Sequence, residues 1–272
     1  MSTSLQPSHE QVPPDGSGSE SGSGSDATAS ATPAVADASA PPFASLLDNP
    51  VWTALSGPHR HLAETEGSAA RYPEAVSPFA ALADCDDPRQ WTDLATLIGP
   101  GNAFALASVP KLPEGWDIGQ SGTGVQLVAD SLRGEADEEA VRLGASDVPE
   151  MLDLVGRTKP GPFMPRTIEL GAYYGIRREG VLAAMAGERL RVPGGTEISA
   201  VCTDERYRGQ GLASRLIRHT AAGIQERGET PFLHAAAVNT GAIRLYESLG
   251  FSLRRTVVFH FLRVPEHALT GR

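Results

Sequence analysis

A glycine-spaced turn at residues 206–211, which reads Arg206-x-x-Gly209-x-Gly211, carries the strongest chemical signal in the chain. A stretch with β-branched residues at 198–201 precedes it, and an amphipathic helix follows at once. A strand, a glycine turn and a helix in this order gather backbone N–H groups and a positive helix terminus around one point. Glycine has no Cβ, so the backbone can approach an anion closely. The pattern predicts a turn that binds a pyrophosphate.

The elements around this turn follow from apolar periodicity. Apolar residues recur at helical spacing after the turn, so the helix is expected to pack on a sheet through one face. Asp147 is expected to cap an earlier helix, with Glu150 as its partner in a pair that resembles a capping box. The other predicted elements are a strand at 139–143, a hairpin formed by 172–177 and 181–190, a strand at 196–203, a helix at 210–226, a strand at 232–238, a helix at 241–249 and a strand at 251–262.

A second informative block, residues 237–251, reads Ala-Val-Asn-Thr-Gly-Ala-Ile-Arg-Leu-Tyr-Glu-Ser-Leu-Gly-Phe. The turn resembles the acyl-CoA signature of the GNAT superfamily of N-acetyltransferases, and this block is similar to the family's later strand–Asn–helix–Tyr-x-x-x-Gly-Phe segment. The resemblance covers about residues 137–265. It implies an α+β fold of the GNAT type, with a central mixed, mostly antiparallel twisted sheet flanked by helices. It also implies acetyl-CoA as the co-substrate.

The resemblance assigns residues to the donor site. Backbone N–H groups at 208–213 would anchor the pyrophosphate, with the Arg208 side chain as an added charge. The backbone of Val201 and Thr203 would pair with the pantetheine arm, and the Val201 amide would polarise the thioester. Asn239 either contacts pantetheine or only caps the following helix. The predicted cofactor-binding residues are Val201, Thr203, Arg206, Arg208, Gly209, Gln210, Gly211, Leu212, Ala213 and Asn239.

Tyr246 is the predicted general acid. In the family this position holds a tyrosine that faces the CoA sulfur. A phenol with a pKa of about 10 can protonate a thiolate with a pKa of about 8.5–9 in a slightly uphill step. The alternative is an ordinary tyrosine that packs its ring on the sheet.

Glu197 is the predicted general base. It lies at even spacing from Val201 and Thr203, which predicts that all three side chains share one face of a strand. Glu188 on the neighbouring strand and Glu169 in the preceding loop are alternatives. A chain of water molecules could also replace a direct base.

The remaining reactive side chains predict little chemistry. His234 is expected to be a hydrogen-bonded structural residue, with a base as the alternative. Cys202 alternates with Val201 and is expected to be a buried thiol. The sequence contains no Cys-x-x-Cys or His-x-x-x-His, so no metal site is expected. Aromatic and Met residues either line the acceptor cleft or belong to the core: Phe163, Met164, Tyr173 and Tyr174.

Composition limits the class of protein. The 272 residues include 23 Lys and Arg against 33 Asp and Glu, a net charge of −10 that argues against a general nucleic-acid binder. The two cysteines cannot form a disulfide framework, so a reducing cytoplasm is expected. No apolar run approaches the ~20 residues that span a bilayer, and the N-terminus lacks the pattern of a signal peptide.

Three regions are predicted along the chain. Residues 1–42 are rich in Ser, Gly, Pro, Ala and acids, and they are expected to form a disordered tail. Residues 43–130 form a small α+β region, with a helix that starts at Asp87-Pro88 and strands at 103–109 and 125–128. Residues 137–266 form the acetyltransferase domain. By analogy with the family, the extra N-terminal region either resembles a degenerate copy of the fold or shapes the acceptor groove.

The predicted function is direct transfer of an acetyl group from acetyl-CoA to a primary amine of a small-molecule or peptide acceptor. Two alternatives remain: an inactive CoA-binding sensor, and a transferase for a longer acyl group. The overall acidity weakly favours a cationic acceptor through electrostatic steering. The oligomeric state is left open.

Overall fold

The computed structural model describes residues 42–116 and 119–269, which belong to one compact unit. The predicted disordered tail at 1–42 lies outside the described residues except for Pro42. The predicted boundary between residues 43–130 and 137–266 stays a prediction.

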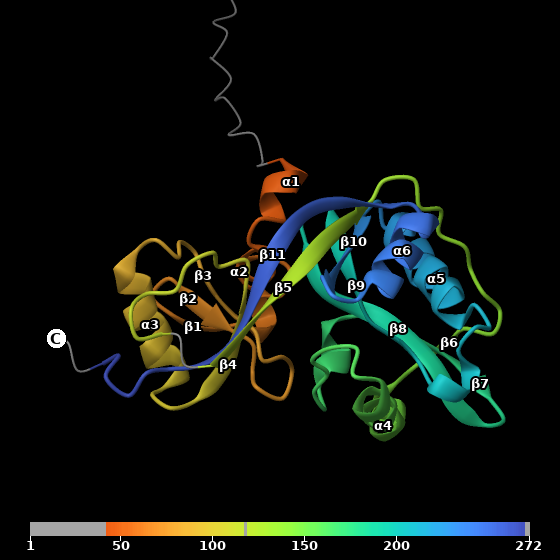
Figure 1. Cartoon of the computed structure of the whole chain (residues 1–272), viewed down its shortest axis with the longest axis horizontal. Coiled ribbons are helices and arrows are strands. Elements are labelled where there is room, and N and C mark those ends of the chain that lie inside the picture. Colours follow the sequence, from red (N-terminus) through yellow and green to blue (C-terminus); the bar gives the residue numbers. More distant parts are fainter. Residues whose placement is uncertain (1–41, 117–118, 270–272) are drawn as a thin grey trace, which may run out of the picture. The chain divides into compact units, whose positions relative to one another are not determined.

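An eight-stranded sheet forms the centre of this unit (Figure 1). β9 and β10 are parallel, and every other neighbouring pair is antiparallel, so the prediction of a mixed, mostly antiparallel sheet is confirmed. The strand order is β4 (Ala103–Ala107), β11 (Phe251–Arg263), β5 (Gly119–Ala129), β10 (Thr230–Ala236), β9 (Gly195–Thr203), β8 (Val181–Val192), β7 (Tyr173–Arg178) and β6 (Val141–Arg142).

Helices cover both faces of the sheet. On one face lies α4 (Val148–Thr158), whose Met151 packs in one cluster with Cys202 of β9. On the other lie α5 (Leu212–Glu226) and α6 (Thr240–Leu249). Leu216 of α5 packs against Ala184 of β8. The apolar stripe of each helix therefore faces the sheet, as its periodicity predicts.

The region before residue 119 contains α1 (Phe43–Leu46), α2 (Pro50–Ser56), α3 (Pro88–Ile98) and a small sheet of β1 (Glu64–Glu66), β2 (Ala69–Arg71) and β3 (Ala80–Leu82). The helix predicted to start at Asp87-Pro88 is α3, and Asp87 caps it, because its Oδ1 accepts a hydrogen bond from the Arg89 N–H at 3.0 Å. This region also joins the large sheet. β4 pairs with β11, and Leu47 packs in one cluster with Phe232 of β10.

The predicted capping box of α4 is wrong. The Asp147 side chain accepts from the Gly144 N–H at 2.8 Å and makes no cap bond to α4. The Glu150 carboxylate accepts from the Leu182 N–H at 2.7 Å. Both carboxylates also bind the Arg177 guanidinium from β7, and charge-assisted hydrogen bonds of this kind are stronger than a neutral cap.

A β-bulge interrupts β9 and distorts its alternation. Met185 pairs with Cys202 and Gly187 pairs with Ser199, so two steps along β8 match three along β9. Ala200 has a φ of 53°, a left-handed conformation that a non-glycine residue adopts at a cost of roughly 1–2 kcal/mol. The extra residue shifts every side chain beyond it to the opposite face.

The bulge overturns one prediction about β9. Ile198 and Val201 pack into the same cluster against α5 and α6, although odd spacing would separate them in a regular strand. Glu197 precedes Ile198, so it lies on the opposite face from Val201. The prediction that Glu197 shares a face with Val201 and Thr203 is therefore wrong, because even spacing holds only without a bulge.

We expect Gly187→Ala to destabilise the protein by about 1–3 kcal/mol, because a Cβ would stand 2.2 Å from Cδ1 of the buried Tyr173 ring. Gly156→Ala in α4 is the control. Its Cβ would meet no atom within 4 Å, and alanine favours a helix over glycine by up to about 1 kcal/mol. Urea denaturation of both variants should give shifts of opposite sign. Equal stabilities would contradict the packing described for β7 and β8.

Candidate functional site

β9 and β10 separate within the sheet, and a cavity opens where they part. Their parallel pairing is limited to Thr230, Pro231 and Phe232. Beyond it, residues 233–236 of β10 pair with β5. The cavity has a volume of about 490 Å³, and its walls include residues 198–203 of β9 and 234–236 of β10. The edge of β9 beyond Glu197 is therefore open to a ligand.

The glycine turn lies at one end of this cavity. Gly209 and Gly211 have φ values of 79° and 73°, and a Cβ at either would meet no protein atom within 4 Å. Glycine is therefore needed here for backbone conformation and not for packing. In the described chain, the backbone N–H groups at 209–214 make no hydrogen bond. These amides and the start of α5 suit an anion. The prediction of a free N–H at Arg208 is wrong, because this group donates to the Glu205 carbonyl at 3.3 Å.

The predicted cofactor-binding residues divide into two groups. Those that line the cavity are Val201, Thr203, Arg208, Ala213 and Asn239. Those that do not line it are Arg206, Gly209, Gln210, Gly211 and Leu212. Arg206 pairs with Asp204, with Nη2 and Oδ2 3.0 Å apart. The Leu212 side chain is buried under the sheet.

The N-terminal end of α6 also borders the cavity. Asn239 caps this helix, because its Oδ1 accepts from the Ala242 N–H at 3.2 Å. Tyr246, one of the cavity residues, is 8 % exposed. Burial, with a smaller contribution from the Cys202 thiol, raises the pKa of Tyr246 to about 12. The phenol therefore keeps its proton at neutral pH.

A buried cluster joins three neighbouring strands at the point of separation. Arg189 of β8 donates from Nε and Nη2 to Glu197 of β9, at 2.8 and 2.6 Å. His234 Nδ1 of β10 lies 2.7 Å from Glu197 Oε1. Burial would raise the pKa of Glu197, but the charge and hydrogen bonds of Arg189, with His234, lower it to about 2. Glu197 is fully buried and ionised.

Both ring nitrogens of His234 are engaged. Gln126 Nε2 lies 3.0 Å from His234 Nε2. The Gln126 Oε1 accepts from Arg254, so its amide group turns Nε2 toward the imidazole. His234 therefore accepts at Nε2 and donates from Nδ1 to Glu197. This arrangement supports the structural interpretation of His234, although its ring reaches the cavity wall.

No carboxylate among the described residues lines the cavity. Glu197 stands behind Arg189, and its role as a general base stays a prediction that this geometry does not favour. Glu188 accepts from Arg227 at 3.1 Å. Glu169 pairs on the surface with Arg166 at 2.6 Å. Neither alternative base lines the cavity.

The half of the cavity away from the turn contains residues that sequence reasoning missed. They are Phe79, Arg189, Phe259 and Phe261. Lys159 was missed too, but it follows Arg157 and Thr158, which bind Asp204 and Cys202 near the end of β9 that leads into the turn. Phe79 belongs to the N-terminal region, and the Arg189 guanidinium carbon lies 5.3 Å from its ring centre. Arg189 and Glu197 lie on either side of a short turn in the sequence. Opposite charges at such positions can pair across two neighbouring strands, so this ion pair could have been predicted from the sequence. Phe163 and Tyr173 instead meet edge-on in the α4 core.

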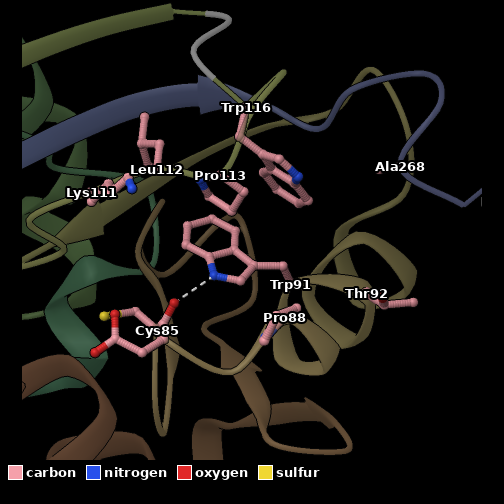
Figure 2. Close-up of a pocket in the computed structure, with 10 residues that line it drawn as sticks. Cys85, Pro88, Trp91, Thr92, Lys111, Leu112, Pro113, Trp116 and Ala268 are labelled. Atoms are coloured by element: carbon pink, nitrogen blue, oxygen red, sulfur yellow. Dashed lines mark hydrogen bonds between the residues drawn. The ribbon is translucent and has the colours of Figure 1, made fainter.

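A second, smaller cavity of about 280 Å³ lies between the start of α3 and the loop at 111–116 (Figure 2). Trp91 and Trp116 meet edge-on there, with ring centres 4.9 Å apart. The Trp91 Nε1 donates to the Cys85 carbonyl at 2.8 Å, and burial raises the pKa of the Cys85 thiol. The predicted site residues all lie outside this cavity.

Cys202 is a buried thiol, as predicted, and burial raises its pKa to about 11. The described residues hold no group of three His, Cys, Asp or Glu that would suit a metal ion. Within residues 42–116 and 119–269, no helix has the length and apolar character to cross a membrane.

We expect Glu197→Gln to destabilise the fold by about 3–5 kcal/mol, because it leaves the Arg189 charge buried without a partner. The folded pKa of Glu197 lies below its ordinary value of 4.5, so its contribution is full above that pH and is lost as pH falls toward 2. The stability gap between wild type and variant, from urea unfolding, should therefore narrow in acid. Glu169→Gln is the surface control, and equal effects of the two changes would contradict this account.

Comparisons with known proteins find relatives of this chain. A family model described as FR47-like protein matches residues 173–260. A [Ribosomal protein bS18]-alanine N-acetyltransferase from Escherichia coli K12 is 29 % identical over 116 residues, which span 40 % of this chain and 78 % of that protein.

Solved structures extend the match beyond this segment. A GCN5-related N-acetyltransferase from Kribbella flavida shares the fold at 21 % identity and a TM-score of 0.56, over 84 % of this chain and 98 % of that one. A structure assigned as a GNAT-family acetyltransferase from Novosphingobium aromaticivorans is 43 % identical with a TM-score of 0.74, over 80 % of this chain and 98 % of that chain. With this identity and coverage, the chain belongs to the GNAT family of acetyltransferases.

Proposed function

We propose that this protein transfers an acetyl group from acetyl-CoA directly to a primary amine. Acetyl-CoA-dependent N-acetylation is the reaction of the family to which the chain belongs. The observation that carries the proposal is the cavity between β9 and β10, which has the glycine turn at one end and Tyr246 in its wall. The bS18-alanine acetyltransferase relative acts on an alanine of a ribosomal protein, which supports an amine as the kind of acceptor.

The donor half of the cavity matches the parts of CoA. The amides at 209–214 and the positive end of α5 bind the pyrophosphate, and Arg208 adds a charge. The open edge of β9 offers the backbone of Val201 and Thr203 to the pantetheine amides. The Val201 N–H then polarises the thioester oxygen, which stabilises the charge that develops as the amine attacks.

Tyr246 donates its proton to the departing CoA thiolate, and the proton that the nitrogen loses as the amide forms is returned to the phenolate through solvent. A phenol pKa of about 12 lies about three units above that of a free thiol, so the transfer costs about 4 kcal/mol before binding effects. Burial in the same site also disfavours the CoA thiolate and so raises the pKa of the CoA thiol. The difference between the phenol and thiol pKa values is therefore smaller in the site.

The amine loses its proton to solvent before it attacks. No described carboxylate lines the cavity, and both nitrogens of His234 are engaged. Positive groups in the wall lower the pKa of a bound ammonium and so favour the neutral amine, which is the nucleophile. A side-chain base is not required.

We expect Tyr246→Phe to lower kcat by about 10²-fold or more while the Kd for acetyl-CoA changes little, because only the proton donor is removed. Calorimetry measures acetyl-CoA binding, and release of free thiol measures turnover with a panel of amines. Tyr174→Phe is the control, since Tyr174 packs on His219 and lies outside the cavity. Failure of the wild type to bind acetyl-CoA would overturn the proposed function. Binding without thiol release would indicate the sensor alternative.

The absence of a side-chain base predicts a pH profile. Below the pKa of the acceptor amine, kcat/KM should rise about tenfold per pH unit, because the rate follows the fraction of neutral amine. An imidazole base would instead level the profile above about pH 7. Initial rates between pH 6.5 and 8.5 with one alkylamine decide between the two. A plateau within this range would contradict the proposal and indicate a side-chain base.

A further inference from the structure

The walls of the β9–β10 cavity carry one sign of charge. Among the described residues that line it, the ionised side chains are Lys159, Arg189 and Arg208, and there is no Asp or Glu. Arg208 stands beside the turn and serves the pyrophosphate in the proposed function. Arg189 remains for the acceptor half, and Lys159 lies nearer the end of β9. A ligand with a second positive charge would meet repulsion there without a compensating carboxylate.

Arg189 presents hydrogen-bond donors to this half of the cavity. Its Nε and Nη2 bind Glu197, and in the described chain Nη1 has no acceptor. The residue is 9 % exposed and its exposed part reaches the cavity wall. Glu197 is fully buried and does not line the cavity. The ion pair with Glu197 therefore balances the guanidinium charge but leaves the N–H groups on the outer edge of the guanidinium unpaired. A carboxylate fits this edge best, because it can accept two parallel hydrogen bonds.

Lys159 adds a second positive group to the cavity wall. It ends α4 in a left-handed conformation with φ 49°, and its side chain is exposed. No ion pair forms between Lys159 and the described acidic residues. An anion in the cavity would thus be attracted by a free ammonium and bound by a fixed guanidinium.

The rest of this half is apolar and aromatic. Phe79 lies under the Arg189 guanidinium, and Phe259 meets the His234 ring edge-on at 5.7 Å between centres. Phe261 is 45 % exposed and also lines the cavity, as does Pro160. An uncovered phenyl ring beside buried ones marks a surface for an apolar part of a ligand.

We infer that the acceptor is an amine that also carries a carboxylate and an apolar body, as in an amino acid with an aromatic or aliphatic side chain. The carboxylate binds the outer edge of Arg189, and the apolar body contacts Phe79, Phe259 and Phe261. This inference rests on the proposed function in placing the acceptor in this cavity. It reverses the expectation, drawn from net charge, of a cationic acceptor.

Four amines test the assignment by thiol release with acetyl-CoA: L-phenylalanine, phenylalaninamide, phenethylamine and spermidine. Rates are compared per concentration of neutral amine, so that differences in amine pKa cancel. We expect kcat/KM for phenylalanine to exceed that for the amide and for phenethylamine at least tenfold, with spermidine lowest. Phenethylamine or spermidine as the better substrate would overturn the inference. An equal rate for the amide would overturn the carboxylate part of it.

A binding measurement separates this inference from the proposed function. Calorimetry with CoA present compares N-acetylphenylalanine with N-acetylphenethylamine, and it needs no turnover. Tighter binding of the carboxylate, by at least tenfold, supports the inference even if no amine releases thiol, in which case the proposed function fails alone. Equal binding of the two products overturns the inference while the acetyl transfer proposal stands.

Paired variants locate the carboxylate. The double variant Arg189→Gln with Glu197→Gln removes both charges together and so avoids an unpaired buried ion. It should bind acetyl-CoA but lose the preference for N-acetylphenylalanine. Arg191→Gln is the matched control on the same strand, because Arg191 pairs on the surface with Glu229. The inference fails if the double variant still prefers N-acetylphenylalanine to N-acetylphenethylamine. If the double variant does not fold, the comparison of the two products with the wild type decides.

Discussion

The site depends on the separation of β9 and β10 within a continuous sheet. After Glu197 and Phe232 the two strands no longer share hydrogen bonds, and this gap makes a cavity without breaking the core. Such a fork exposes backbone groups that a sheet would otherwise satisfy. Arg189, Glu197 and His234 come from three successive strands and meet at its apex. Their hydrogen bonds hold the strands together at the last point before they diverge.

The bulge at Ala200 works with this cluster. Without the extra residue, the side chains of β9 would alternate regularly, and Glu197 would face α5 and the donor half. With this bulge and a second register shift between Glu188 and Arg191, Glu197 faces Arg189, while Val201 still packs toward α5. A buried carboxylate is thereby placed where a guanidinium can neutralise it. The strain of one left-handed alanine is small beside the cost of an unpaired buried charge.

The elements and the donor site could be predicted from the sequence because their signals are local. The turn at Gly209 and Gly211, the helix after it and the tyrosine four residues before Gly250 each depend on neighbours in the chain. The acceptor side could not be predicted in the same way. Phe79 reaches it from a region that joins the large sheet through β4 and β5, and nothing local in its sequence indicates this contact. The bulge could not be predicted either, because an alanine at position 200 does not indicate a positive φ.

Net charge and local charge point in opposite directions in this protein. The chain carries −10 overall, yet the described ionised residues around the cavity are all cations. Long-range steering follows the sum of all charges and is screened over about 8 Å at physiological salt. Recognition follows the few groups that a ligand touches after water is displaced, where interactions are less screened. For an amine nucleophile the local cations also serve the reaction, since they disfavour the ammonium that cannot attack. A cavity of this charge therefore selects the reactive form of its acceptor as well as the anion that accompanies it.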